Sequence, residues 1–143
     1  GLVAQRGVGG PGREVRAGDY LLAIESLQRL TRRIARFLGP YDVFVNPTMS
    51  EPPAPIGEIT STPDDPMRAL ARGGRTIAYS GVIANFTGHP AMSVPAGLNA
   101  DGIPIGVHVL GRFGDEATLL QLAGQLERAR PWTDVEPAIC APT

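Results

Sequence analysis

The sequence predicts an α/β fold in which a mixed β-sheet is flanked by helices. Two segments carry apolar residues at helical spacing, one after Asp19 and one after Asp115, and short apolar runs bounded by turn residues lie between them. Hydrophobic residues make up 43% of the 143 residues, and charged residues make up 19%. This length and balance are typical of a packed globular chain and not of a disordered or fibrous one.

The first helix is predicted to begin near Asp19 and to end at Gly39-Pro40. Residues 1–18 contain six glycines, so we expect a flexible loop there and the folded portion over residues 19–143. Aspartate is a suitable N-cap, and glycine followed by proline is a usual helix stop. The apolar positions of this helix recur at helical spacing: Tyr20, Ile24, Leu27, Ile34 and Leu38.

The middle of the chain is predicted to hold a strand, a long loop and a helix. Residues 43–45 form an apolar run that predicts a buried strand stopping at Pro47, which has no N–H to donate. Residues 50–66 contain five prolines, which favours an irregular connection. Residues 67–84 have a helical pattern, with Gly73-Gly74 as a break or a start.

The last part of the chain predicts a turn, a hairpin and a final helix. Residues 85–90 are expected to form a tight turn, and residues 92–95 and 105–110 two strands. Residues 99–102, Asn-Ala-Asp-Gly, suit the hairpin between them because asparagine, aspartate and glycine tolerate positive φ. The final helix has Asp115 and Glu116 in its first turn, a buried stripe, and a stop at Pro131. The stripe consists of Leu119, Leu122 and Leu126.

Composition argues against several classes of partner. The net charge of −1 lacks the basic excess of a nucleic-acid-binding protein. No apolar run approaches transmembrane length, and the first residues have no signal-peptide layout, so we expect neither a membrane partner nor secretion. The single cysteine, Cys140, cannot form an internal disulfide and fits a reducing compartment, so a cytoplasmic location is expected.

The residues offer no complete catalytic or metal site, and no cofactor is expected. There is no lysine, so a lysine base is excluded within this chain. None of the five serines lies in a Gly-x-Ser-x-Gly elbow, and the nearest approach is Ser80. A serine would need His89 or His108 as its base, and two histidines at this spacing match no metal motif. The arginines of the first helix favour a solvated face over a phosphate site: Arg29, Arg32, Arg33 and Arg36.

Three stretches, taken in order, resemble the C-terminal region of the amidase-signature family. Residues 41–48, Tyr-Asp-Val-Phe-Val-Asn-Pro-Thr, are similar to the family's strand ending in Pro-Thr. Residues 85–97, Asn-Phe-Thr-Gly-His-Pro-Ala-Met-Ser-Val-Pro-Ala-Gly, resemble its Asn-x-x-Gly-x-Pro-Ala-x-Ser-x-Pro-x-Gly run. Residues 102–111, followed by the final helix, match the order of its last hairpin and helix. The resemblance covers about residues 19–133 and only the last part of the family's usual length.

The resemblance implies a role in the hydrolysis of a small-molecule amide. Family members use a serine, a second bridging serine and a lysine, all upstream of this region, so no catalytic residue is expected here. This portion would supply scaffold and a wall of the substrate pocket. The substrate-binding residues that it implies are Asn46, Tyr79, Asn85, Phe86 and Thr87. For Asn85 a turn-capping role is the alternative, and for Phe86 a place in the core.

One departure narrows the activity, and two other readings stay open. Members that bind an amino-acid ammonium have an aspartate seven residues before the turn asparagine; Ala78 stands there, so that activity is not expected. The second hypothesis is a non-catalytic α/β binding or assembly module, and the third a small enzyme using Ser80 and His89. Under the first hypothesis the missing N-terminal part would cover one sheet face. The chain alone should then expose an apolar patch, self-associate or bind a hydrophobic dye.

Overall fold

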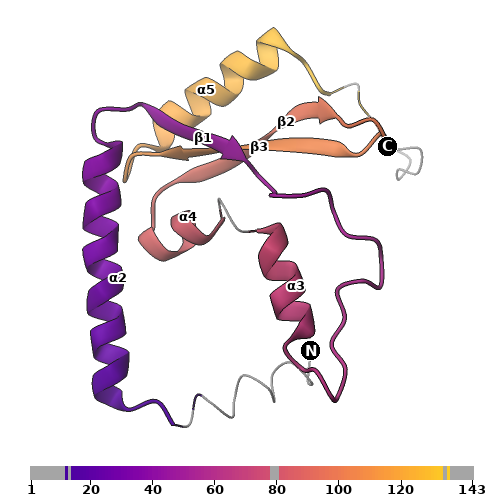
Figure 1. Cartoon of the computed structure of the whole chain (residues 1–143). Coiled ribbons are helices and arrows are strands. Elements are labelled where there is room, and N and C mark those ends of the chain that lie inside the picture. The colour runs from indigo at the N-terminus through magenta and orange to yellow at the C-terminus, as the bar shows by residue number, and fades with distance from the viewer. Residues whose placement is uncertain (1–11, 13, 78–80, 134, 136–143) are drawn as a thin grey trace.

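The computed structural model describes residues 12, 14–77, 81–133 and 135, which form a three-stranded sheet and four helices of the α/β class (Figure 1). The sheet order is β1-β3-β2, and both pairings are antiparallel. Helix α5 lies on one side of the sheet, and α2, α3 and α4 lie on the other. The α/β class is thus confirmed, whereas a mixed sheet remains a prediction for a longer protein.

Helix α2, Ala17–Leu38, begins two residues before the predicted start. Arg16 occupies the N-cap position without a side-chain cap, so Asp19 lies in the first turn, where its charge suits the helix dipole. The helix ends at Gly39 as predicted. The expectation of a flexible loop is therefore wrong for residues 17 and 18, and residues 1–11 and 13 lie outside the described part of the chain.

Strands β2, Ala91–Leu98, and β3, Pro104–Gly111, form the predicted hairpin. The side-chain oxygen of Asn99 accepts hydrogen bonds from the backbone N–H of Asp101 at 2.9 Å and of Ile103 at 2.8 Å. Gly102 has φ +76°, a left-handed conformation that favours glycine. The turn chemistry expected for residues 99–102 is confirmed.

Strand β1, Val43–Pro47, has the predicted end but not the predicted burial. It pairs with β3 over 62 residues of sequence separation, for example Asn46 opposite His108. Because β1 is an edge strand among the described residues, Val45 is 55% exposed. An apolar run alone cannot distinguish a central strand from such an edge.

The core lies between the sheet and α5, Glu116–Ala129. Val94, Val109 and Leu119 are buried together, and Leu122 packs against them. Leu126 is 37% exposed, so the predicted stripe loses contact with the sheet after its second leucine. Asp115 caps the helix by accepting from the backbone N–H of Thr118 at 3.4 Å. Hydrogen bonds from Thr118, followed by those from Arg112, lower the pKa of Asp115.

The predicted helix over residues 67–84 is divided into α3, Arg68–Thr76, and α4, Gly81–Thr87. Gly73 and Gly74 lie inside α3, so they neither break nor begin it, and the interruption falls after Thr76. Residues 85–87 close α4, so the expectation that they belong to a turn is wrong. The chain leaves this helix at Gly88, whose φ is +71°.

Candidate functional site

A row of polar side chains crosses the sheet on the face away from α5. Asn46 and Ser93 each pair directly with His108, and directly paired residues share one face of a sheet. Val107 and Val109, which alternate with His108 along β3, point to the α5 side. The polar row therefore faces the side on which α2 and α4 lie (Figure 1).

The hydrogen bond between Asn46 and His108 defines the character of this row. Nδ1 of His108 lies 2.9 Å from Oδ1 of Asn46, and the histidine is only 7% exposed. Burial lowers the pKa of His108, so the neutral ring is favoured. A neutral ring that donates from Nδ1 to the amide oxygen keeps a lone pair on Nε2. The row thus holds a hydrogen-bond acceptor in place and not a positive charge.

Thr48 and Ser93 continue the polar face beside His108. Their hydroxyl oxygens lie 2.6 Å apart, and the backbone N–H of Thr48 donates to the carbonyl of Gly106 at 3.0 Å. A Cβ at position 106 would lie 2.8 Å from both hydroxyl oxygens, closer than atoms normally approach. Glycine is therefore required here by the two side chains that cross above it.

The end of α4 forms a second polar contact. The Thr87 hydroxyl donates to the carbonyl of Ile83 at 2.6 Å and lies 2.8 Å from Nδ1 of His89. His89 is 4% exposed, its ring packs edge-on against Phe113, and burial lowers its pKa. Its Nε2 is buried without a hydrogen-bond partner in the described part of the chain.

The structure places the predicted substrate-binding residues in three environments. Asn46 is half-buried in the polar row, Thr87 is buried, and Asn85 and Phe86 are exposed on α4. Phe86 is 59% exposed, so it is not part of the core here. Asn85 lies in the helix and caps no turn. Tyr79 lies outside the described residues.

Sequence reasoning missed the partnership of Asn46 with His108 and that of Thr48 with Ser93. Each pair joins β1 to the hairpin, and no local pattern reveals which residues of distant strands lie opposite one another. The available signal was the Gly106 position within the third stretch. A glycine at the centre of an apolar strand often marks a close approach of other groups.

A cavity of about 250 Å³ lies at the end of β1 beside this polar face. One side is formed by residues 49–53 at the start of the proline-rich loop, and the other by residues 103–106. It is open and mainly lined by apolar groups, including Pro47. Such a concave, largely apolar space with a few polar neighbours is typical of a small-molecule site.

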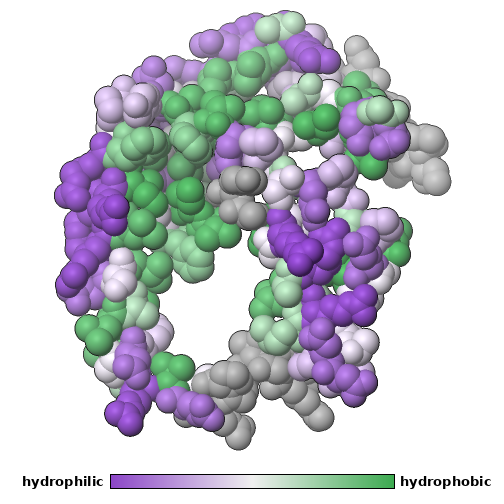
Figure 2. All heavy atoms as spheres, viewed as in Figure 1, coloured by the Kyte–Doolittle hydropathy of each residue, from purple (hydrophilic) through white to green (hydrophobic). Residues whose placement is uncertain are grey.

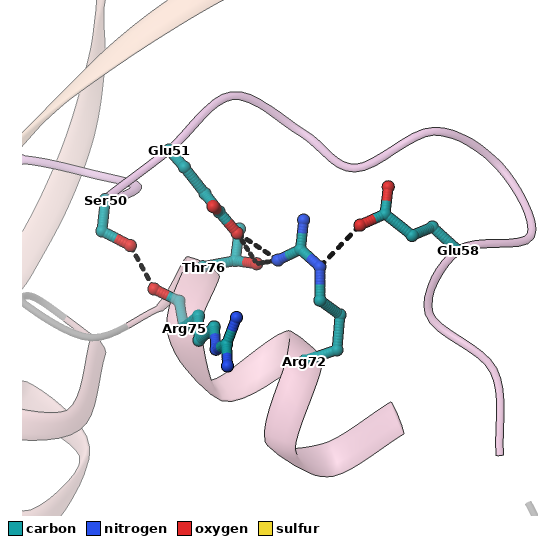
Figure 3. A network of polar contacts seen from close by, with 6 residues as sticks. All are labelled: Ser50, Glu51, Glu58, Arg72, Arg75 and Thr76. Carbon is teal, nitrogen blue, oxygen red and sulfur yellow. Dashed lines mark hydrogen bonds and ion pairs between the residues drawn. The ribbon is translucent and has the colours of Figure 1, made fainter. Parts of the chain in front are cut away.

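The loop that walls this cavity is held to α3 by Arg72 (Figure 3). The guanidinium donates from Nε to Glu58 at 2.7 Å and from Nη1 to Glu51. Hydrogen bonds to Glu58 and then to Glu51 raise the pKa of Arg72, so the ion pairs persist across the ordinary pH range. Ser50 adds a backbone bond to the carbonyl of Thr76 at 3.0 Å and a side-chain bond to the carbonyl of Arg75. The proline-rich loop is therefore fastened along α3 and does not hang free.

Metal-ligating side chains and long apolar helices bear on the possible chemistry. Among the residues that the structure describes, no three histidine, cysteine, aspartate or glutamate side chains are grouped so that they could hold a metal ion. Within the same residues, no helix has the length and apolar character needed to cross a membrane. Ser80, Ala78 and Cys140 lie outside the described part.

The family model described as Amidase matches residues 5–120. The chain belongs to the amidase family. This membership agrees with the three stretches noted in the sequence and covers all the elements that form the polar face.

Relatives of the amidase family resemble the chain in sequence and in structure. A putative amidase, AmiC, of Mycobacterium leprae is 41% identical over 114 residues, which are 80% of this chain and 24% of the relative. The 6-aminohexanoate-cyclic-dimer hydrolase of Paenarthrobacter ureafaciens is 29% identical over 135 residues, 91% of this chain and 27% of the relative. A solved structure of a 6-aminohexanoate cyclic dimer hydrolase with its substrate superposes with a TM-score of 0.78 at 28% identity, covering 88% of this chain and 27% of that one.

The chain spans only about a quarter of the length of the curated relatives that it matches. The same holds for the solved structures, including that of a glutamyl-tRNA(Gln) amidotransferase from Thermotoga maritima, which shares the fold with a TM-score of 0.62. The family is therefore established for this chain, whereas the activity of a whole amidase is a matter for proposal.

Proposed function

We propose that this chain is the C-terminal segment of an amidase-signature hydrolase that cleaves carbon–nitrogen bonds of small-molecule amides. In this proposal it supplies scaffold and one wall of the substrate pocket, while the Ser-Ser-Lys triad comes from the portion before it. The observation that carries the proposal is the polar row of Asn46 and His108, which lies on the sheet face opposite α5, in a chain spanning a quarter of its amidase relatives.

The pocket wall that we propose consists of Asn46 and the α4 segment, with Tyr79, Asn85, Phe86 and Thr87. The exposed side chains on α4 are available to a substrate. The Thr87 hydroxyl is already used by Ile83 and His89, so Thr87 would act by fixing the end of α4. Asn46 would act through the amide group that it does not use toward His108. No cofactor or metal is part of the proposal, and we place the parent enzyme in the cytoplasm.

The proposal is tested by measuring the hydrolysis of a panel of aryl and aliphatic amides. The 143-residue chain is compared with a fused protein in which it replaces the corresponding segment of AmiC. We expect no turnover by the chain alone and turnover by the fused protein. Turnover by the highly purified chain alone would contradict a nucleophile located elsewhere.

A non-catalytic module that kept the amidase fold is the alternative. It predicts that the fused protein is folded yet inactive toward every amide, although the AmiC parent hydrolyses some of them. A small enzyme based on Ser80 and His89 is tested by Ser80→Ala, which would abolish any turnover of the chain alone. Nε2 of His89 is buried among the described residues, and this geometry does not favour it as a base.

A further inference from the structure

Helix α2 has an apolar face that is wider than the part covered by its neighbours. Ile24, Leu27 and Ile34 are half-buried along one stripe. Leu30 and Phe37 lie seven residues apart, and therefore on one side of the helix, next to that stripe. They are 43% and 55% exposed. A surface helix normally turns such side chains toward a neighbour, and none covers them among the described residues.

The lengths of the helices explain why this surface is open. Helix α2 has 22 residues and is about 33 Å long, whereas α4, which packs beside it, has 7 residues and is about 10 Å long. Figure 1 shows α2 extending well past α4, away from the sheet. The first turns of α2 are consequently exposed as well, with Tyr20, Leu21 and Leu22 each at 60% or more.

The apolar surface continues from α2 onto the edge of the sheet. The Phe37 ring lies 5.6 Å from Tyr41 and 6.3 Å from Phe44, centroid to centroid. All three aromatic side chains are at least 38% exposed. We call the set of Leu30, Phe37, Tyr41 and Phe44 the α2 apolar face. A continuous aromatic and aliphatic surface of this kind marks an interaction site more often than scattered apolar residues do.

The shape and charge around this face restrict its partner. Figure 2 shows apolar residues on the α2 side of an opening through the molecule, with hydrophilic residues along the outer side of α2. The exposed arginines of α2 occupy that outer side, and Glu25 pairs with Arg29 there at 2.6 Å. A symmetric dimer would place the same concave surface on both sides of the contact and leave the opening unfilled. The surface therefore suits a convex apolar partner.

The relatives indicate which partner has that shape. The chain superposes on 27% of a solved amide hydrolase with a TM-score of 0.78, so the fold of that relative is completed by polypeptide outside the matched segment. We propose that the α2 apolar face docks the preceding portion of an amidase domain through a convex apolar surface, with the arginine side of α2 left in water. This inference rests on the proposed function, since its partner is the remainder of the same enzyme.

The experiment mixes the 143-residue chain with an N-terminal portion of AmiC that lacks the corresponding segment, and it measures association by native mass spectrometry and titration calorimetry. We expect a one-to-one complex that Leu30→Glu and Phe37→Glu each weaken by about tenfold or more. The matched control is Gln28→Glu, which adds the same charge on an exposed position of α2 outside the apolar face, with an effect of about twofold or less.

The same variants are tested in the fused protein, so that the result does not depend on the separate folding of the AmiC portion. Leu30→Glu and Phe37→Glu should lower its Tm, whereas Gln28→Glu should not. Equal effects of all three variants would overturn the docking proposal, as would a dimer of the chain that Leu30→Glu disrupts without any binding of the AmiC portion. Association without amide hydrolysis would leave the docking proposal intact and overturn the proposed function.

Discussion

Nδ1 of His89 lies 2.8 Å from Oγ1 of Thr87, and this contact determines which ring nitrogen carries the proton. The Thr87 hydroxyl already donates to the carbonyl of Ile83, so it accepts from Nδ1. Nε2 then holds the lone pair in a buried position, without a partner in the described part of the chain. Because protonation at Nε2 would bury a charge, the structure links this histidine to the pH dependence of stability.

We expect the free energy of unfolding to fall as the pH falls below about 6.5. Burial lowers the pKa of His89 and of His108 from an ordinary value of 6.5, so the folded chain binds protons less readily than the unfolded chain. The stability present above pH 6.5 is thus lost as the pH falls through 6.5 toward the folded pKa. Each histidine contributes a slope of at most about 1.4 kcal/mol per pH unit. Urea denaturation between about pH 7.5 and 5 measures this slope.

The control for the pH dependence is a pair of substitutions that do not titrate. His89→Gln and His108→Gln each keep a group able to form hydrogen bonds, and each should reduce the slope. The double variant should show the flattest profile. A double variant that keeps the full slope would show that neither histidine is responsible.

Gly106→Ala should destabilise the chain by about 1–3 kcal/mol. The new Cβ would lie 2.8 Å from the hydroxyl oxygens of Thr48 and Ser93, so the pair must separate or β1 must shift. Gly124→Ala in α5 is the matched control, because its Cβ meets only an Arg128 nitrogen at 3.5 Å and alanine favours a helix. Chemical denaturation should give opposite signs for the two variants, and equal signs would contradict the crowding at Gly106.

Arg72→Lys should loosen the proline-rich loop. A lysine keeps the charge but lacks the planar group that reaches Glu58 and Glu51 together. Hydrogen exchange should therefore speed up at the backbone N–H groups of Ser50 and Glu58, which are bonded within this segment. Arg75→Lys is the control, because only the backbone carbonyl of Arg75 takes part in the network. Equal exchange in both variants would show that the ion pairs do not hold the loop.

Gly102→Ala should destabilise the β2–β3 hairpin by about 1–2 kcal/mol, because residue 102 has φ +76° and an alanine side chain is strained there. Asn99→Ala should have an effect of similar size, since it removes the acceptor of two backbone N–H groups. Asp101→Asn should change stability by less than about 0.5 kcal/mol, because only the backbone of Asp101 takes part in the turn. Thermal unfolding of the three variants would contradict the turn geometry if Asp101→Asn had the largest effect.

The sequence by itself determined the elements whose causes are local. The hairpin turn follows from Asn99 and Gly102, the helix stop from Gly39, and the last helix from the capping of its first turn at Asp115. Each of these depends on residues a few positions apart, so the residue types are sufficient evidence. The three stretches that carry the amidase resemblance are equally local, and the family was identified through them.

The tertiary structure alone decided the burial of β1 and the composition of the polar row. Val43–Val45 is an apolar run whether it lies in the centre or at the edge of a sheet, and only its pairing with β3 made it an edge. Asn46 and His108 are 62 residues apart, so their contact depends on the strand register. The exposure of Phe37 and Leu30 has the same origin, because helical periodicity predicts an apolar face but cannot say which part of it a neighbour will cover.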